Sequence, residues 1–367
     1  MYRKEKSIPL KSSSSALYNN LSVLRLPDKQ LAYFTTVHST AVNMVSASGD
    51  GLSFSHRLLQ VKEGGPAISA SIVTQAAWCV LPSRVLLVLT SQKGIQVRLF
   101  SMEDKKQSHG AGRMSSVKKA GLLGYRTMLG YVLEILPERD WRSLREAVEP
   151  KAVEAFPTIL DLTLLFSLSR CTSQMAPSWF TGMHWMSWSV HQHKQCLLEG
   201  SQQLVDASSA WDGAGDLVTA DDSGTLCTWS SGEEFTLLHK IPAFGCTCSS
   251  VKLWNGIVAA GYGNGQIRLY EAATGVLRAE VNAHARWIYA LDLAPLTGKL
   301  LSGAEDSFVH IWKLSKNLDT EDIEIEHCHS ECVTDTQICG ARFCDPEGNS
   351  FAVTGYDLSE IFRYSQV

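Results

Sequence analysis

Long apolar runs are scarce in this sequence. The longest, near ILDLTLLFSL (159–168), is far shorter than the roughly 20 residues that a membrane-spanning helix requires. The opening YRKEKSIPL lacks the apolar core of a secretory signal peptide. Tyr2 stands where N-terminal myristoylation requires glycine. We therefore expect neither an integral membrane segment nor an export signal.

A surplus of basic charge is also missing. The formal net charge is −4, and the charged residues make up 19% of the chain. A protein that binds nucleic acid needs a basic face for the phosphates, so we expect no nucleic-acid partner. The ten cysteines occur without an export signal, which is typical of reduced thiols in a cytoplasmic protein. We predict a cytoplasmic location.

What the chain does contain is a repeated phrase of twelve residues. It occurs as VTADDSGTLCTW (218–229), AAGYGNGQIRLY (259–270), LSGAEDSFVHIW (301–312) and VTGYDLSEIFRY (353–364). Each copy opens on small or β-branched residues, places Asp or Asn at a turn, and alternates into a strand that ends in Trp or Tyr. The closing aromatics lie 41, 42 and 52 residues apart. A period of roughly 40–45 residues with four short strands per unit predicts the blades of a β-propeller.

These repeats resemble the blades of WD-repeat proteins. The most specific parts of the resemblance are DLVTADDSG (216–224) and AAGYGNGQ (259–266). The resemblance implies an all-β propeller and non-enzymatic binding of protein partners through the loops. It also implies a cytoplasmic adaptor with peripheral vesicle association, a link to growth-factor-receptor signalling and assembly into a homo-oligomer. No cofactor and no catalytic residue is expected.

Three regions follow from the distribution of strand and turn signals. Residues 1–97 and 215–367 read as N-terminal and C-terminal blades. Residues 98–214 depart from the family pattern, beginning where Arg98 takes the place of a closing aromatic. We expect an irregular insert there, with a short helix in PERDWRSLREAVEP (137–150). We interpret the insert as a splice variant, an unspliced intron or a shifted reading frame.

The last phrase ends three residues before Val367. In WD-repeat propellers the final blade is often completed by an N-terminal strand. We predict that LSVLRL (21–26) or LAYFTTV (31–37) supplies it, because closure removes exposed sheet edges.

Four residues occupy the positions of the buried hydrogen-bonded tetrad of WD-repeat blades: His284, Ser302, Asp306 and Trp312. A buried imidazole is costly without partners, so we expect one ring nitrogen to bond the Asp and the other the Ser. His, Ser and Asp together also suggest a catalytic triad, the basis of a hydrolase alternative. No Gly-x-Ser-x-Gly elbow accompanies them, which favours the structural role. In the other three phrases the set is incomplete.

A second cluster, His327, Cys328, His329 and Cys332, resembles a list of zinc ligands, with Cys339 and Cys344 beyond it. A metal-binding module over 327–344 is therefore the alternative function. Against it, the histidines alternate along one predicted strand, and paired Cys-x-x-Cys knuckles are missing.

The glycine run from Gly261 to Gly265 resembles a phosphate-binding loop. Such a loop must lead into a helix. Here the run leads into QIRLY (266–270), which alternates like a strand, so we predict a hairpin turn.

Overall fold

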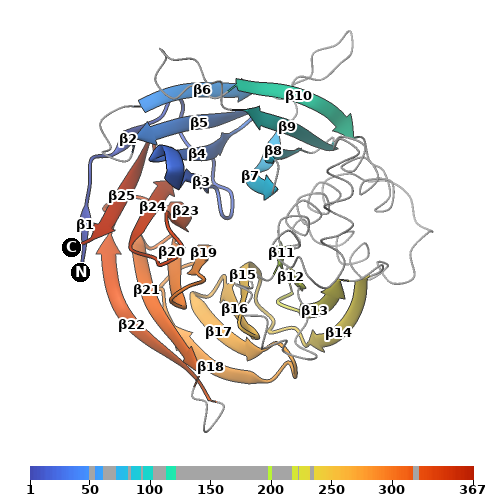
Figure 1. The fold of residues 1–367 in the computed structure, drawn as a ribbon. Helices are drawn as coiled ribbons and strands as arrows, with labels where there is room; N and C mark the ends of the chain where they lie inside the picture. The colour runs from blue at the N-terminus through green and yellow to red at the C-terminus, as the bar shows by residue number, and fades with distance from the viewer. Residues whose placement is uncertain are drawn as a thin grey trace.

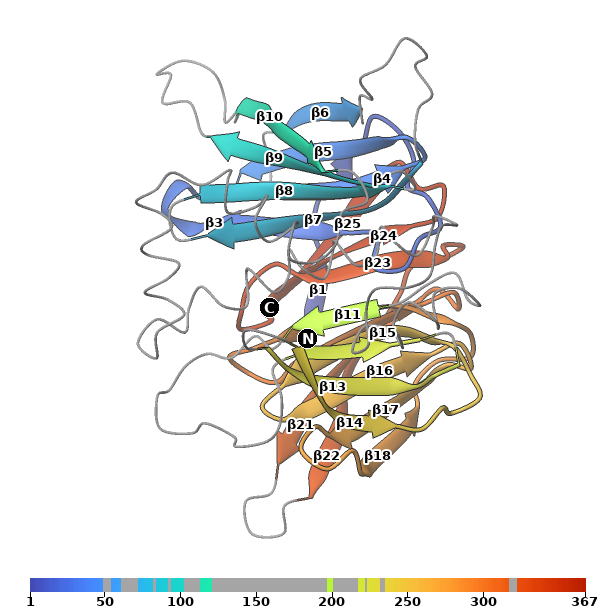
Figure 2. The ribbon, with the colours of Figure 1, turned by 90° about the vertical axis from the view of Figure 1, so that its right-hand side faces the viewer.

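The computed structural model describes residues 1–48, 54–60, 72–81, 84–91, 94–101, 113–120, 197–200, 217–221, 223–231, 235–316 and 322–367. In this part of the chain the strands form six antiparallel sheets arranged around a common axis (Figure 1). Seen from the side, the sheets lie as twisted blades, and the two termini lie close together (Figure 2). The prediction of an all-β WD-repeat propeller is confirmed.

Each sheet is a meander of neighbouring strands. The sheets are β3 (Ser22–Leu26), β4 (Leu31–His38), β5 (Ala41–Ser48) and β6 (Phe54–Gln60); β7 (Val73–Leu81), β8 (Arg84–Ser91), β9 (Gly94–Ser101) and β10 (Arg113–Ala120); β11 (Leu197–Gly200), β12 (Leu217–Ala220), β13 (Leu226–Ser231) and β14 (Phe235–Ile241); β15 (Cys248–Trp254), β16 (Ile257–Tyr262), β17 (Gln266–Glu271) and β18 (Leu277–Asn282); β19 (Ile288–Ala294), β20 (Lys299–Ala304), β21 (Phe308–Lys316) and β22 (Ile323–Cys332); and β23 (Ile338–Phe343), β24 (Ser350–Gly355) and β25 (Glu360–Gln366). A 3₁₀ turn, η1 (Pro27–Lys29), joins β3 to β4.

The four twelve-residue phrases are the hairpins that join the second and third strands of four sheets: β12–β13, β16–β17, β20–β21 and β24–β25. Their closing aromatics all lie on the third strand. The glycine run is the β16–β17 turn and leads into β17, as predicted.

The last sheet is closed by the N-terminus, but by a different segment from the two predicted. β1 (Tyr2–Lys4) and β2 (Ile8–Pro9) both pair antiparallel with β25. The prediction of 21–26 or 31–37 as closing strand was wrong, because these runs alternate over five and eight residues and form β3 and β4 of their own sheet. The N-terminal segment therefore both completes one blade and leads into the next.

The core lies between adjacent sheets. A buried cluster formed by the β15–β18 and β19–β22 sheets contains Ile257, Leu269, Ile288, Leu300 and Trp312. Each fully buried side chain of this size stabilises the fold by about 1.5–3 kcal/mol. Inner strands of successive sheets contact one another from β11 through β15, β19, β23 and β3 to β7.

Residues 10–21 form hydrogen bonds with strands of several neighbouring blades. Asn20 fixes β4 through both backbone groups of Val37: its side-chain amide donates to the carbonyl at 3.0 Å, and its oxygen accepts from the N–H at 2.7 Å. Asn19 accepts a hydrogen bond from Ser250 of β15 at 3.1 Å and donates its backbone N–H to Tyr289 of β19 at 2.9 Å. One short segment thus ties three blades to each other.

The strand pattern continues past the expected break at Arg98. β9 runs through Arg98 to Ser101, and its buried aromatic is Phe100, which contacts the rings of Tyr33 and Trp78 at 4.8 and 5.3 Å. β10 and β11 also fall inside 98–214. The predicted helix over 137–150 lies outside the described residues.

No helix in the described ranges is long and apolar enough to cross a bilayer.

Candidate functional site

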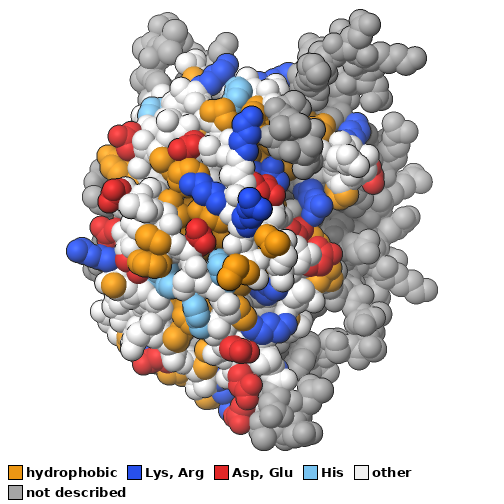
Figure 3. All heavy atoms as spheres, turned by 90° about the vertical axis from the view of Figure 1, so that its left-hand side faces the viewer, with side chains coloured by type: hydrophobic (Ala, Val, Ile, Leu, Met, Phe, Trp, Pro, Cys, Tyr) orange, Lys and Arg blue, Asp and Glu red, His pale blue; other side chains and the backbone are white. Residues whose placement is uncertain are grey.

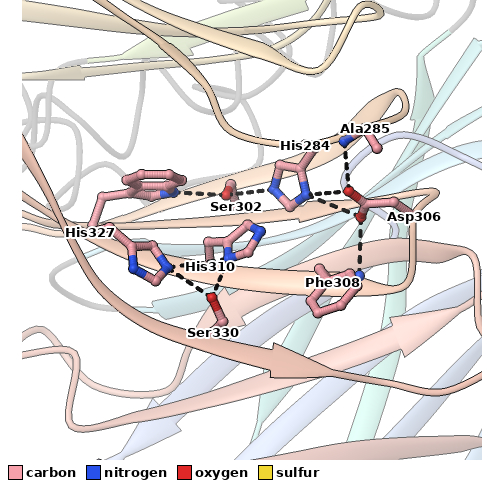
Figure 4. Close-up of polar contacts among 9 residues, drawn as sticks. His284, Ala285, Ser302, Asp306, Phe308, His310, His327 and Ser330 are labelled. Carbon is pink, nitrogen blue, oxygen red and sulfur yellow. Dashed lines mark hydrogen bonds and ion pairs between the residues drawn. The ribbon is translucent and has the colours of Figure 1, made fainter.

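The tetrad of His284, Ser302, Asp306 and Trp312 is assembled from four parts of one blade. His284 precedes β19, Ser302 lies in β20, Asp306 lies in the β20–β21 turn, and Trp312 lies in β21. The structure brings the four side chains into one line of hydrogen bonds (Figure 4). The indole of Trp312 donates to Ser302 Oγ at 3.0 Å, Ser302 Oγ lies 2.8 Å from His284 Nε2, and His284 Nδ1 lies 3.1 Å from both oxygens of Asp306.

The direction of these hydrogen bonds follows from the chemistry of Trp312. An indole N–H only donates, so the Ser302 oxygen accepts from it and the Ser302 proton is directed at His284 Nε2. In the neutral ring this places the proton of His284 on Nδ1, which donates to Asp306, and in the protonated ring Nδ1 donates to the same carboxylate. Asp306 also accepts from the backbone N–H groups of Ala285 and Phe308, at 2.9 and 3.1 Å. Every polar group of the tetrad has a partner.

This arrangement holds a blade together and leaves no free nucleophile. Ser302 is 0% exposed and His284 is 8% exposed, so no substrate reaches either side chain. Burial alone would raise the pKa of Asp306, but the hydrogen bond and charge of His284 and the two backbone N–H groups lower it below its usual value. Asp306 is therefore a carboxylate that fixes the turn.

A related pair, which the sequence reasoning did not identify, lies in the β11–β14 sheet. Trp229 donates its indole N–H to Thr219 Oγ1 at 3.1 Å. Thr219 and Ser302 both stand second in their twelve-residue phrase, and Trp229 and Trp312 both close it. A hydroxyl at position two with a Trp at position twelve was the signal that could have found this pair.

The other two phrases end in Tyr, and their contacts differ. Tyr262 and Tyr270 join their hydroxyl groups at 3.2 Å in the β15–β18 sheet. Tyr364 stacks on Phe351 with ring centroids 4.7 Å apart in the last sheet. The closing aromatic is thus kept while its partner changes from blade to blade.

The proposed zinc ligands His327, Cys328, His329 and Cys332 all lie on β22, the outer strand of its sheet. Cys328 and Cys332 are exposed free thiols, and burial raises the pKa of Cys328. The ring of His329 lies 5.2 Å from that of Tyr2. In the described ranges no group of three or more His, Cys, Asp or Glu side chains is placed to hold a metal ion. Cys339 and Cys344 are buried on β23 and in the loop after it.

His327 belongs instead to a small polar network with His310 of β21. Ser330 Oγ lies 2.8 Å from His310 Nδ1 and 2.8 Å from His327 Nε2 (Figure 4). Burial, together with the charges of His284 and His327, lowers the pKa of His310 to about 4. Histidine side chains gather on this rim of the ring among acidic, basic and apolar side chains (Figure 3). At neutral pH the imidazole of His310 is therefore uncharged.

One end of the ring carries an aromatic patch, formed by Tyr18, Trp287, Tyr289 and Tyr356, that the sequence reasoning did not single out. Tyr18 stacks on Trp287 with centroids 6.4 Å apart and lies 4.9 Å from Tyr289. Trp287 is 36% exposed and Tyr356 is 56% exposed. The four aromatics come from residues 10–21 and from two blades, so only the assembled ring could reveal them.

The ring of antiparallel sheets and the tetrad define a WD-repeat β-propeller. The chain belongs to the WDR54 family, whose model matches residues 1–105 and 198–367. It is 46% identical to WD repeat-containing protein 54 of Mus musculus over 369 residues and 45% identical to that of Homo sapiens over 373 residues, with all of each chain covered. The stretch that the family model leaves unmatched, 106–197, falls within the region 98–214 that we predicted to depart from the pattern.

Proposed function

We propose that this chain is a non-enzymatic scaffold that binds protein partners through the loops at the ends of its propeller. A rigid scaffold that presents loops is the usual setting for recognition. The observation that supports the proposal best is the closed tetrad: its serine is fully buried and already engaged by His284 and Trp312. The His, Ser and Asp side chains that suggested a catalytic triad therefore have a structural role.

The experiment that tests this proposal uses a fluorophosphonate probe, which labels activated serine nucleophiles. We expect no labelling of the full-length chain, because Ser302 is inaccessible. Labelling that disappears in Ser302→Ala while the fold persists by circular dichroism would establish a hydrolase and overturn the proposal. Metal analysis of the purified protein addresses the zinc alternative: about one zinc per chain, lost in Cys328→Ser/Cys332→Ser, would favour a metal-binding module over 327–344.

We further propose that the scaffold acts in the cytoplasm and at vesicle surfaces, takes part in growth-factor-receptor signalling and assembles with copies of itself. The support for these points is the similarity of the chain to WD repeat-containing protein 54, from which these expectations were drawn. Fractionation of cells would test the location, and light scattering of the purified chain would test self-association. A protein found only in the nucleus, or one that stays monomeric over a wide concentration range, would contradict them.

A further inference from the structure

The aromatic patch lies at the end of the ring where each blade receives the chain from the previous one. Antiparallel meanders place the turn between second and third strands at the same end as the connection between blades. The turn with Asp306 and the connection with Trp287 therefore share this end, and a hydrogen bond of 2.9 Å from the Glu305 N–H to the Trp287 carbonyl joins them. The connection before β23 and the β24–β25 turn with Tyr356 lie at the same end.

Ring contacts and hydrogen bonds link the residues of the patch. Trp287 and Tyr289 are joined by the ring of Tyr18. The hydroxyl of Tyr289 forms a hydrogen bond with the side chain of Gln337. The backbone carbonyl of Gln337 in turn accepts a hydrogen bond from the backbone N–H of Tyr356 at 2.8 Å. Trp287 is also held from below, because its indole lies directly over Gly263, where a Cβ would come within 2.8 Å of the ring. The aromatic surface is therefore fixed in place and exposed at Trp287 and Tyr356.

The connections at this end of the ring carry more acidic than basic residues. In the described connections at this end of the ring, the acidic residues Asp221, Glu305, Asp306, Asp335 and Asp357 outnumber the basic residues Lys11 and Arg286. Asp335 and Asp357 are exposed. The pKa of Tyr289 is raised chiefly by burial and then by the negative charge of Glu305. Glu305 therefore lies close enough to act electrostatically on a ring of the patch.

We propose that the aromatic patch and the carboxylates of Glu305, Asp335 and Asp357 bind an arginine-containing segment of a partner protein. A guanidinium group stacks on the face of Trp or Tyr and is attracted by the ring quadrupole. The same group pairs with carboxylates in a planar, bidentate geometry. Exposed rings bordered by carboxylates offer both contacts. This inference rests on the proposed scaffold function and assigns one of its contact surfaces.

Fluorescence anisotropy with labelled peptides of six arginines, six lysines and six glutamates tests the proposal on the full-length chain. We expect the arginine peptide to bind most tightly, the lysine peptide more weakly, and the glutamate peptide not at all. Raising the salt concentration should weaken binding, because the carboxylates are exposed. Tyr356→Ala, at the most exposed ring of the patch, should weaken binding of the arginine peptide by several fold, and Trp287→Ala should weaken it by about tenfold. The affinity of Trp287→Phe should lie between those of the unaltered chain and Trp287→Ala.

Two matched triple variants separate the patch from general attraction of a cation to an acidic protein. Glu305→Gln/Asp335→Asn/Asp357→Asn removes three charges at the patch; the two asparagines tolerate the left-handed backbone of positions 335 and 357. Asp28→Asn/Asp322→Asn/Glu347→Gln removes three charges from loops at the opposite end. We expect at least tenfold weaker binding in the first and little change in the second.

Equal losses in the two triple variants, or tight binding of the glutamate peptide, would overturn the patch as an arginine site. That result would leave the scaffold function standing, because partners recovered with the full-length chain could use other loops. The scaffold function would instead be contradicted by fluorophosphonate labelling of Ser302, which is measured independently of peptide binding.

Discussion

The indole N–H of Trp312 donates a hydrogen bond to the hydroxyl of Ser302 across 3.0 Å, and this bond joins the third strand of its blade to the second. The same hydroxyl lies 2.8 Å from His284, so one oxygen serves two buried partners. Neither partner has access to water to replace it.

Ser302→Ala should therefore lower the free energy of unfolding by about 1–3 kcal/mol, because it leaves an indole N–H and an imidazole nitrogen unpaired in the interior. Chemical denaturation monitored by circular dichroism measures the change. Ser315→Ala makes the same chemical change at an exposed position of the same blade, and we expect it to alter stability by less than about 0.5 kcal/mol. Equal effects of the two substitutions would contradict the structural role of the tetrad.

Much of this blade could be predicted from the sequence because the information is local. The twelve-residue phrase specifies two strands and a turn, and the spacing from Asp306 to Trp312 indicates which side chains face each other. The closing strand could not be predicted in the same way. β1 is three residues long, and its pairing with β25 is set by the ring bringing the two ends of the chain together.

The aromatic patch was missed for a related reason. Tyr18, Trp287 and Tyr356 are separated by long stretches of sequence, and none of them follows a periodic pattern. Tyr18 reaches this end of the ring because Asn19 and Asn20 hold residues 10–21 against β15 and β4. The sequence repeats are enough to predict the blades, whereas the contacts between blades become apparent only in the three-dimensional structure.

Gly265 offers a test of how tightly neighbouring blades meet. Its φ of +84° lies in the left-handed region, and a Cβ there would come within 2.0 Å of the carbonyl oxygen of His284. Gly245 has a φ of +79° with no atom within 4 Å of an added Cβ. We expect Gly245→Ala to cost about 1–2 kcal/mol for its backbone conformation alone.

Gly265→Ala should cost that amount and about 1–3 kcal/mol more, since the His284 carbonyl must move. Thermal or chemical denaturation of the two variants gives the difference. Similar losses for both glycines would show that the β16–β17 turn and the loop that carries His284 are less closely packed than described.

Closure of the last blade by β1 also has a measurable consequence. Tyr2 is buried against Phe351 and His329, its hydroxyl donates to the Gly348 carbonyl, and Lys299 donates to that hydroxyl at 3.3 Å. Tyr2→Ala should lower the free energy of unfolding by about 3 kcal/mol and release β1 from β25. The freed edge of β25 should promote association of chains.

Light scattering and hydrogen exchange at β25 would detect the opening. Arg3→Ala, at an exposed position of the same strand, should leave both measurements close to those of the unaltered chain. If Tyr2→Ala neither exposes β25 nor increases association, closure of the ring does not depend on this strand.

The histidine network on the outer rim should make stability depend on pH. The folded-state pKa of His310 is lowered to about 4, chiefly by burial and then by the charges of His284 and His327, against 6.5 in an ordinary environment. Between pH 4 and pH 6.5 the unfolded chain therefore binds more protons at this residue than the folded chain does. The linkage relation then requires stability to rise with pH across this window and to fall as the solution is acidified.

From pH 7 to pH 5 we expect His310 to contribute a loss on the order of 1–2 kcal/mol, smaller than the full pKa difference implies because the side chain is partly exposed to solvent. His310→Gln removes the titrating group, so its free energy of unfolding should change less over the same interval. The same substitution at His38, in a different sheet, controls for the loss of a histidine. Parallel pH profiles for the unaltered chain and His310→Gln would show that protonation of His310 does not oppose folding.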